Sequence, residues 1–230
     1  MKYKNIKIGK FIERPNRFIA KVDIDGVIET VHVKNTGRCR VLLINGRKAV
    51  LATSENTKRK TKYDLIAVDK NGVLVNIDSQ APNAAAFEWI KSGGIFSKNA
   101  FVRREVAFGN SRFDLYVEDG DKKAFIEVKG VTLEDNGIAM FPDAPTERGA
   151  KHLKELIESK NKGYEAYILF VIQMKGISKF FPNDKTDPNF SAALREAEKQ
   201  GVNILVYDCE VGFDHMKIDK PVAFETERKI

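Results

Sequence analysis

The amino-acid sequence predicts two domains of α+β or mixed class: a small β-barrel in residues 1–80 and an α/β domain with a central mixed sheet in residues 81–230. Three observations lead to this fold class. The first part contains only short strand-like runs between turn residues, and the second alternates helix-like with strand-like runs. The positive charge is concentrated in the first part, whose net charge is +9 against −2 in the remainder.

The expected barrel consists of short runs rich in β-branched and aromatic residues. We expect strands within residues 7–15, 17–26, 27–35, 38–46, 47–54, 63–72 and 73–78. Pairs such as Asp25-Gly26 and Asn71-Gly72 separate these runs and are typical of tight turns. About five such strands in about 80 residues indicate a closed barrel, and a basic barrel of this size resembles an OB-fold.

The second domain is expected to follow the order helix, three strands, helix, strand, helix, strand. Helical spacing occurs in residues 83–93, 146–163 and 190–200. Strand patterns occur in residues 101–109, on both sides of a turn in 112–131, and in 164–173 and 202–209. The run 164–173 is almost continuously apolar, which is typical of a strand covered on both faces. These elements predict a mixed sheet flanked by helices.

Composition and charge narrow the function classes. A basic first domain indicates a polyanionic partner such as nucleic acid, although lysine-rich surfaces also occur in heat-adapted proteins. We expect no membrane partner and no signal peptide, because the sequence has no apolar run of the required length. Cys39 and Cys209 fit no metal spacing and are expected to be reduced thiols of a cytoplasmic protein. With only three histidines, a zinc site is not expected.

Residues 112–131 are expected to form a β-hairpin that carries charged groups on one face. Apolar and charged residues alternate in both strands, so each strand has an apolar side and a polar side. Two turns are compatible with the sequence, and they pair Glu118 with either Asp121 or Lys123. Both registers place Asp114 on the face of Glu127, and the second sets the two acids directly opposite each other.

Two carboxylates on neighbouring strands can hold a hard divalent cation, and Lys129 can reach the same site. Together with the order of elements, this arrangement resembles the core of PD-(D/E)xK nucleases. The resemblance implies that Asp114, Glu127 and the Val128 carbonyl bind Mg²⁺ or Mn²⁺, and that Lys129 positions the attacking water. Some of these nucleases take another acid from the preceding helix, where Glu88 lies. The alternative is a surface cluster of ion pairs, with Glu88 as a solvated charge.

The start of the expected helix 146–163 is dense in polar groups. Arg148 and His152 lie four residues apart on one helical face. If the helix packs beside the catalytic strands, Arg148, Lys151 and His152 would meet the phosphodiester. The alternative is an ordinary capped amphipathic helix with exposed charges.

Three segments of the first domain interleave basic residues with aromatic residues and small hydroxyl groups. This mixture suits phosphate contacts combined with base stacking, although flexible charged loops have the same composition. The candidate nucleic-acid-binding residues are Arg14, Arg17, His32, Asn35, Arg38, Lys58, Arg59, Lys60 and Tyr63.

Several longer motifs occur in a characteristic order. They read RFIA, HVKNTGR, ENTKRKTKYD, SRFDLY, IEVKGVTL and FPDAPTERGAKHLKEL. As a set they resemble the sugar fermentation stimulation protein A family, over about residues 15–204. The resemblance implies an OB-type N-terminal domain, a PD-(D/E)xK-type C-terminal domain and DNA binding. The family name also implies a role in regulating sugar-utilisation genes.

Three hypotheses follow for the function. The first is a DNA-binding protein with a Mg²⁺- or Mn²⁺-dependent phosphodiesterase site. The second is a DNA-binding regulator of sugar metabolism genes whose nuclease-like pocket has no turnover, and the third is an RNA-binding module. The intact acids and lysine favour the first. The sequence leaves open whether single- or double-stranded DNA is bound, and whether the chain forms a homo-oligomer.

Overall fold

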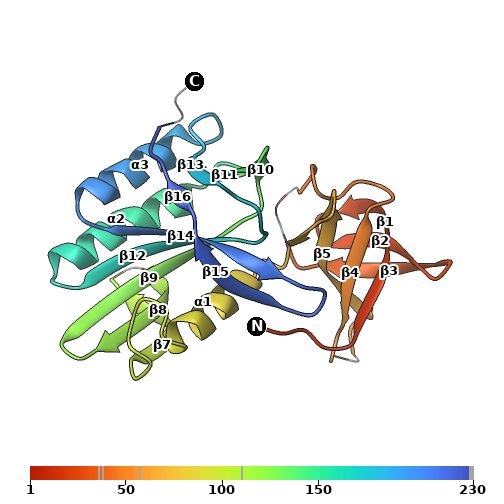
Figure 1. The fold of residues 1–230 in the computed structure, drawn as a ribbon, viewed down its shortest axis with the longest axis horizontal. Helices are drawn as coiled ribbons and strands as arrows, with labels where there is room; N and C mark the ends of the chain where they lie inside the picture. Colours follow the sequence, from red (N-terminus) through yellow and green to blue (C-terminus); the bar gives the residue numbers. More distant parts are fainter. Residues whose placement is uncertain (36, 38, 57, 110, 228–230) are drawn as a thin grey trace.

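The computed structural model describes residues 1–35, 37, 39–56, 58–109 and 111–227. It contains a β-barrel followed by a mixed sheet with helices on both faces (Figure 1). The fold class expected from the sequence is therefore confirmed. Within the described residues, none of the helices combines the length and the apolar character needed to cross a bilayer.

The barrel is built from the first strands of the chain. They are β1 (Ile6–Asn16), β2 (Ile19–Ile24), β3 (Val27–Val33), β4 (Lys48–Thr53), β5 (Tyr63–Lys70) and β6 (Val73–Asn76). Their order in the sheet is β3-β2-β1-β4-β5-β6, and a parallel pairing of β3 with β5 closes five of them into a barrel. This closure leaves β6 as an appended strand, paired antiparallel with β5.

One expected barrel strand, residues 38–46, is absent from the described residues. Residues 40–42 form a turn instead, in which the amide groups of Leu42 and Leu43 donate to the Cys39 carbonyl at 3.0 and 2.9 Å. Leu42 is fully buried in the core. Leu42 and the half-buried Leu43 therefore pack a loop against the core, whereas Val41 and Ile44 are exposed. The prediction of a strand in this run is wrong.

The second domain is organised around a six-stranded sheet in the order β15-β14-β12-β9-β8-β7. The strands are β7 (Phe101–Phe108), β8 (Ser111–Asp119), β9 (Lys122–Val131), β12 (Glu165–Ile172), β14 (Asn203–Val211) and β15 (Met216–Pro221). The central strands β9, β12 and β14 are parallel, whereas the outer strands pair antiparallel.

Helices cover both faces of this sheet (Figure 1). Helix α1 (Ala81–Lys91) covers one face, and α2 (Glu147–Asn161) and α3 (Pro188–Lys199) cover the other. Accordingly, alternate residues of β12 are buried in two different cores: Phe170 packs with the α2 side and Leu169 with the α1 side. This confirms the expectation that 164–173 contains a strand covered on both faces.

A second, smaller sheet was not expected from the sequence. It consists of β10 (Glu134–Asp135), β11 (Ile138–Phe141), β13 (Lys179–Pro182) and β16 (Ala223–Phe224), in the order β10-β11-β13-β16. Its strands are only two to four residues long, so they contain too few residues to show a period. Strand β15 was missed as well.

Buried hydrogen bonds join the two domains around Gln173. Its side-chain amide donates to the carbonyl oxygens of Asn76 and Asp78 at 3.0 and 3.2 Å. The Asp78 carboxylate in turn pairs with Lys34 at 2.7 Å, and Lys70 of β5 pairs with Glu134 of β10. Because the Gln173 contacts are buried on both sides, the connection between the domains has a defined geometry.

Candidate active site

The hairpin formed by β8 and β9 adopts the second of the two expected registers. Glu118 lies opposite Lys123, and Leu115 lies opposite Ile126. Continued by one residue, this register sets Asp114 against Glu127. The hairpin therefore brings two acidic residues from adjacent strands to one end of the sheet.

Both carboxylate oxygens of Asp114 accept hydrogen bonds. The Asn83 side-chain amide, in the first turn of α1, donates to Oδ1 at 2.6 Å, and the Val128 backbone amide donates to Oδ2 at 2.8 Å. Burial raises the pKa of Asp114 above its ordinary value, and the nearby charge of Glu127 adds to this rise. Asp114 is therefore held between α1 and β9 in a site that favours a compensating positive charge.

The two oxygens of Glu127 differ in their surroundings. Oε1 accepts a hydrogen bond from Lys129 at 2.7 Å and a second one from His152 Nδ1. Oε2 is buried and has no hydrogen-bond partner among the described residues. Burial alone would raise the pKa of Glu127, but the hydrogen bonds from His152 and Lys129 outweigh it and hold this pKa below its ordinary value. Glu127 is therefore an anion with one oxygen left to bind a ligand.

Helix α2 supplies the group that holds Glu127. It begins at a cap in which the Thr146 hydroxyl accepts from the Gly149 amide at 3.0 Å. Arg148 Nε lies 3.3 Å from His152 Nε2. Because Arg148 can only donate, Nε2 accepts, and the His152 proton is on Nδ1, where it is given to Glu127.

The structure corrects the expectation for His152. Its side chain is buried, 5% exposed, and contacts Glu127, so it does not present a free ring to a phosphate. Arg148 is exposed and reaches the site through its contact with His152. Lys151 is also exposed and lies 3.6 Å from Glu155. Of the three expected phosphate contacts on this helix, only Arg148 both contacts the site and reaches solvent.

Glu88, the expected additional metal ligand, is not brought to this site. Its carboxylate pairs with the Met1 amino group at 2.6 Å, beside β15. Glu88 lies five residues after Asn83 in α1, and this spacing directs the two side chains to different sides of the helix. Asn83 therefore takes the place beside Asp114 that was expected for Glu88.

The chemistry of the donor set fits a hard divalent cation. Asp114, Glu127 and the Val128 carbonyl offer only oxygen, the ligand type of Mg²⁺ and Mn²⁺. Glu127 Oε2, buried and without a partner among the described residues, leaves one carboxylate oxygen able to bind such a cation. The described residues contain no cluster of three or more His, Cys, Asp or Glu side chains arranged to hold a metal ion. A bound Mg²⁺ would therefore keep several water ligands, as is usual for this ion.

The candidate binding residues of the barrel fall into two groups. Arg17, Lys58 and Lys60 are exposed and face solvent, and the Arg17 guanidinium lies 4.8 Å from the ring centre of Phe18. Arg14 instead donates to the carbonyl oxygens of Gly37, Arg17 and Asn35 at 2.6 to 2.7 Å. Arg14 therefore holds a loop in place. The candidate Arg38 lies outside the described residues.

The remaining barrel candidates are engaged within the protein. Arg59 Nη2 and His32 Nδ1 both contact Asp64, at 2.7 and 3.1 Å, and the Asn35 side chain bonds to the Ile77 carbonyl at 2.8 Å. Tyr63 is 5% exposed in the barrel core. The expectation that Tyr63 stacks on a base is therefore wrong, because neither face of its ring is accessible.

Sequence reasoning missed Asn83 and Gln173. Asn83 follows Pro82 at the start of α1, and Gln173 directly follows the buried strand β12. Polar residues at the end of a buried strand often line a site, so Gln173 carried a signal that could have been used. The role of Asn83 depends on how α1 lies against β8, which no local pattern reveals.

Comparison with known proteins supports the architecture. Residues 12–77 match the family described as the SfsA N-terminal OB domain, and residues 80–215 match the sugar fermentation stimulation protein RE domain. The chain is 58% identical to a sugar fermentation stimulation protein homolog of Ruminiclostridium cellulolyticum, over 96% of this chain and 98% of the relative. It is 56% identical to a homolog of Desulfitobacterium hafniense, over 94% and 95% of the two chains.

A solved structure extends this likeness to three dimensions. It is titled "The structure of Pyrococcus Furiosus SfsA in complex with Ca2+". The two folds superpose with a TM-score of 0.86 at 30% sequence identity, covering 98% of each chain.

Proposed function

Because this chain belongs to the sugar fermentation stimulation protein family, we propose that it is a DNA-binding protein that hydrolyses phosphodiester bonds with Mg²⁺ or Mn²⁺. The observation that carries the proposal is the arrangement around Glu127. Two acids and a lysine from adjacent strands meet at one end of the sheet, and one buried carboxylate oxygen has no partner among the described residues.

Asp114, Glu127 and the Val128 carbonyl would hold the cation. The Pyrococcus relative is described as a complex with Ca²⁺, a hard cation that also prefers oxygen ligands, which supports this assignment. When bound, such a cation supplies Lewis-acid stabilisation of the charge that develops on the phosphate. Asn83 orients Asp114, and His152 orients Glu127, so both acids are held in place before the cation arrives.

Lys129 has two tasks in the proposed reaction. Its ammonium lies 2.7 Å from Glu127 Oε1 and is mostly buried, so its charge acts in a site with little water. There it can position the attacking water and offset the negative charge of the transition state.

Hydrolysis adds one water across a P–O bond: the oxygen joins phosphorus, one product keeps the phosphate, and the other leaves with a hydroxyl group.

The barrel and α2 would supply sequence-independent contacts. Arg17, Lys58 and Lys60 on the barrel are exposed, as is Arg148 on α2. Cationic side chains of this kind bind the phosphate backbone through charge. The two cysteines are buried and unpaired, as expected of a protein that works in the reducing cytoplasm.

A cleavage assay with site variants tests the proposal. The purified chain is incubated with single- and double-stranded DNA and with Mg²⁺ or Mn²⁺, and compared with Asp114→Asn and Lys129→Ala. We expect both variants to lose cleavage while retaining DNA binding. Cleavage that persists at the same rate in both variants would assign the activity elsewhere.

The second candidate is a DNA-binding regulator without turnover. The name of the curated relatives favours it, because it describes an effect on sugar fermentation. Under this alternative, the wild-type chain binds DNA but cleaves neither strand form with Mg²⁺ or Mn²⁺. The same assay therefore separates the two candidates.

A further inference from the structure

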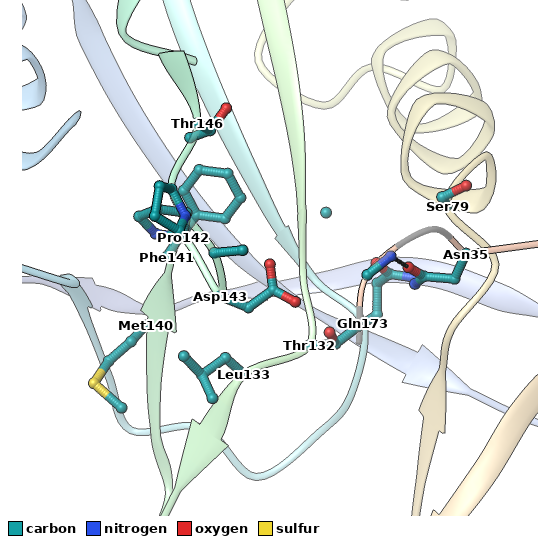
Figure 2. A pocket seen from close by; sticks show the side chains of 14 residues that line it. Asn35, Ser79, Thr132, Leu133, Met140, Phe141, Pro142, Asp143, Thr146 and Gln173 are labelled. Carbon is teal, nitrogen blue, oxygen red and sulfur yellow. Dashed lines mark hydrogen bonds between the residues drawn. The ribbon is translucent and has the colours of Figure 1, made fainter. Parts of the chain in front are cut away.

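A cavity of about 390 Å³ lies where the barrel meets the second domain (Figure 2). Figure 2 shows Asn35, Ser79 and Gln173 on one side of it and Phe141, Pro142 and Thr146 on the other. A cavity of this size can take a ligand as large as a nucleotide. Because both domains line it, the cavity exists only in the assembled chain.

The cavity borders two chain segments of the candidate active site. Gly130, one of its lining residues, follows Lys129 in β9. Thr146, another lining residue, caps the helix that carries His152. A ligand in this cavity would therefore lie next to any phosphate that is held at Lys129.

The walls of the cavity suit a nucleobase better than a phosphate. None of the described residues that line it is basic, and one, Asp143, carries an exposed carboxylate. A carboxylate repels phosphate but accepts hydrogen bonds from the amino group of a base. The Phe141 ring and the Met140 side chain add apolar surface, and Thr132 adds a hydroxyl group.

Two glycines allow close packing at the edge of the cavity. A Cβ atom on Gly130 would lie 2.6 Å from Gln173 Oε1 and 2.7 Å from Pro82 Cγ. A Cβ atom on Gly37 would lie 2.9 Å from Asn35 Oδ1 and 3.2 Å from Asp143 Oδ2. At both positions a side chain would have to displace a residue that lines the cavity, Gln173 at Gly130 and Asn35 at Gly37.

Hydrogen bonds hold the walls in place without a ligand. Asn35 bonds to the Ile77 carbonyl at 2.8 Å and to the Gly37 amide at 2.7 Å. On the opposite wall, the Thr146 amide donates to Asp187 at 2.7 Å. The cavity is therefore formed before any ligand binds, which lowers the cost of ordering it.

Gly37 also lines a second pocket, on the surface of the barrel. Arg14, Arg17 and Arg40 contribute to this pocket, and Arg17 and Arg40 are exposed. The shared glycine makes the two pockets neighbours. The cavity thus lies between two charged regions. On one side is the basic pocket of the barrel, and on the other is the site of Asp114, Glu127 and Lys129.

We propose that the cavity receives one unpaired base of a single-stranded DNA segment, whose phosphates run from the barrel arginines to Lys129. This proposal rests on the nuclease function proposed above and names the strand form of its substrate. A base inside duplex DNA is stacked and paired, so it cannot enter this pocket without being extruded. A strand that is already single avoids this cost.

The test uses Ala144, an exposed residue that lines the cavity. Ala144→Trp fills the cavity, and Ala192→Trp on α3 is the matched control, because it adds the same ring to another exposed alanine. Binding is measured by fluorescence anisotropy without divalent cations, so that no DNA is cut. The probes are a single strand of about 16 nucleotides, the upper site size of one OB-fold, and the duplex of the same sequence.

We expect wild type and Ala192→Trp to bind the single strand more tightly than the duplex. Ala144→Trp should bind the single strand about tenfold more weakly, the effect of losing one stacked base, with duplex binding unchanged. An unchanged single-strand affinity, or an equal loss for both strand forms, would overturn the proposal. Tighter binding of RNA of the same sequence would overturn the choice of DNA.

A second measurement locates the base directly. A single strand containing 4-thiothymidine is photo-crosslinked to the wild-type chain, and the labelled peptide is identified by mass spectrometry. We expect the label within residues 140–146, and labelling confined to other segments would contradict the proposal. Both measurements report on binding alone, so a failure to cleave any DNA would defeat the nuclease function without deciding this inference.

Discussion

His152 Nδ1 donates to Oε1 of Glu127, and in doing so helix α2 determines which oxygen of that carboxylate stays free. Lys129 occupies the same Oε1 atom, so both partners lie on one side of the carboxylate. Oε2 is left buried and without a partner among the described residues. His152 thus orients Glu127, the candidate metal ligand. Because His152 Nδ1 is bonded to Glu127, this nitrogen cannot bind the metal itself.

This relationship predicts that His152 acts as a positioning residue. His152→Ala removes the bond that orients Glu127, and we expect metal affinity or cleavage rate to fall about 10- to 100-fold, the usual effect of losing a partner of a metal ligand. Mn²⁺ affinity is measured by isothermal titration calorimetry, and the cleavage rate at saturating Mn²⁺.

His152→Gln provides the matched control for this prediction. Its amide can donate to the same carboxylate, so it should recover part of the lost Mn²⁺ affinity. If His152→Ala binds Mn²⁺ as tightly as wild type and cuts at the same rate, Glu127 does not depend on this contact.

Asn83 and Glu88 offer a second test within one helix. Asn83→Leu removes one of the two hydrogen bonds to Asp114, and we expect about tenfold weaker Mn²⁺ binding. Glu88→Gln should leave Mn²⁺ affinity unchanged, because Glu88 pairs with the Met1 amino group. Calorimetry on both variants decides the matter: weaker binding in Glu88→Gln alone would restore Glu88 as the additional ligand.

The sequence was informative about the site wherever strand periodicity and chain order determine position. Alternation in the hairpin placed Asp114 and Glu127 on one face, and the structure has one of the two registers that were expected. The contacts of His152 and Asn83 could not be predicted in this way. They depend on how α2 and α1 pack on the sheet, and helix packing follows from side-chain shape over long sequence separations.

The fold, like the site, was predictable where a local sequence pattern determines the structure. Helix α2 was predicted from its helical period, and β12 from its almost continuous apolar run, because burial imposes these patterns on the sequence. The prediction of a strand over residues 40–42 is wrong because a loop that anchors one apolar side chain, Leu42, in the core has a composition similar to that of a strand. The small sheet containing β10 and β16 was not predicted because its strands are too short to show a period. In addition, the pairings β11–β13 and β13–β16 join segments distant in the chain.

Exposed and paired basic residues of the barrel should differ in their effect on the salt dependence of DNA affinity. Lys58 and Lys60 are exposed, and each change to alanine should reduce the slope of log affinity against log salt by about 1. Arg59→Ala should change this slope less, because Arg59 is already paired with Asp64. Anisotropy titrations at several salt concentrations measure the slopes. Equal slopes in wild type and Lys58→Ala would remove Lys58 from the DNA interface.

The pairing of Asp64 predicts how barrel stability depends on pH. Burial alone would raise the pKa of Asp64, but hydrogen bonds from Arg59 and His32 outweigh it, and the pKa lies below its ordinary value. A carboxyl group with a lowered pKa in the folded state stabilises the fold above its unfolded pKa, about 3.9. That stabilisation is lost as the pH falls through the lower, folded value.

Asp64→Asn removes this titration and provides the comparison. When the pH is lowered from neutral to below about 4, the free energy of unfolding should fall more in wild type than in Asp64→Asn. The reason is that only wild type must protonate a paired carboxylate. Urea unfolding at a series of pH values, followed by circular dichroism, gives the difference between the two chains. A constant difference at every pH would show that the Asp64 carboxylate gains nothing from Arg59 and His32 in the folded state.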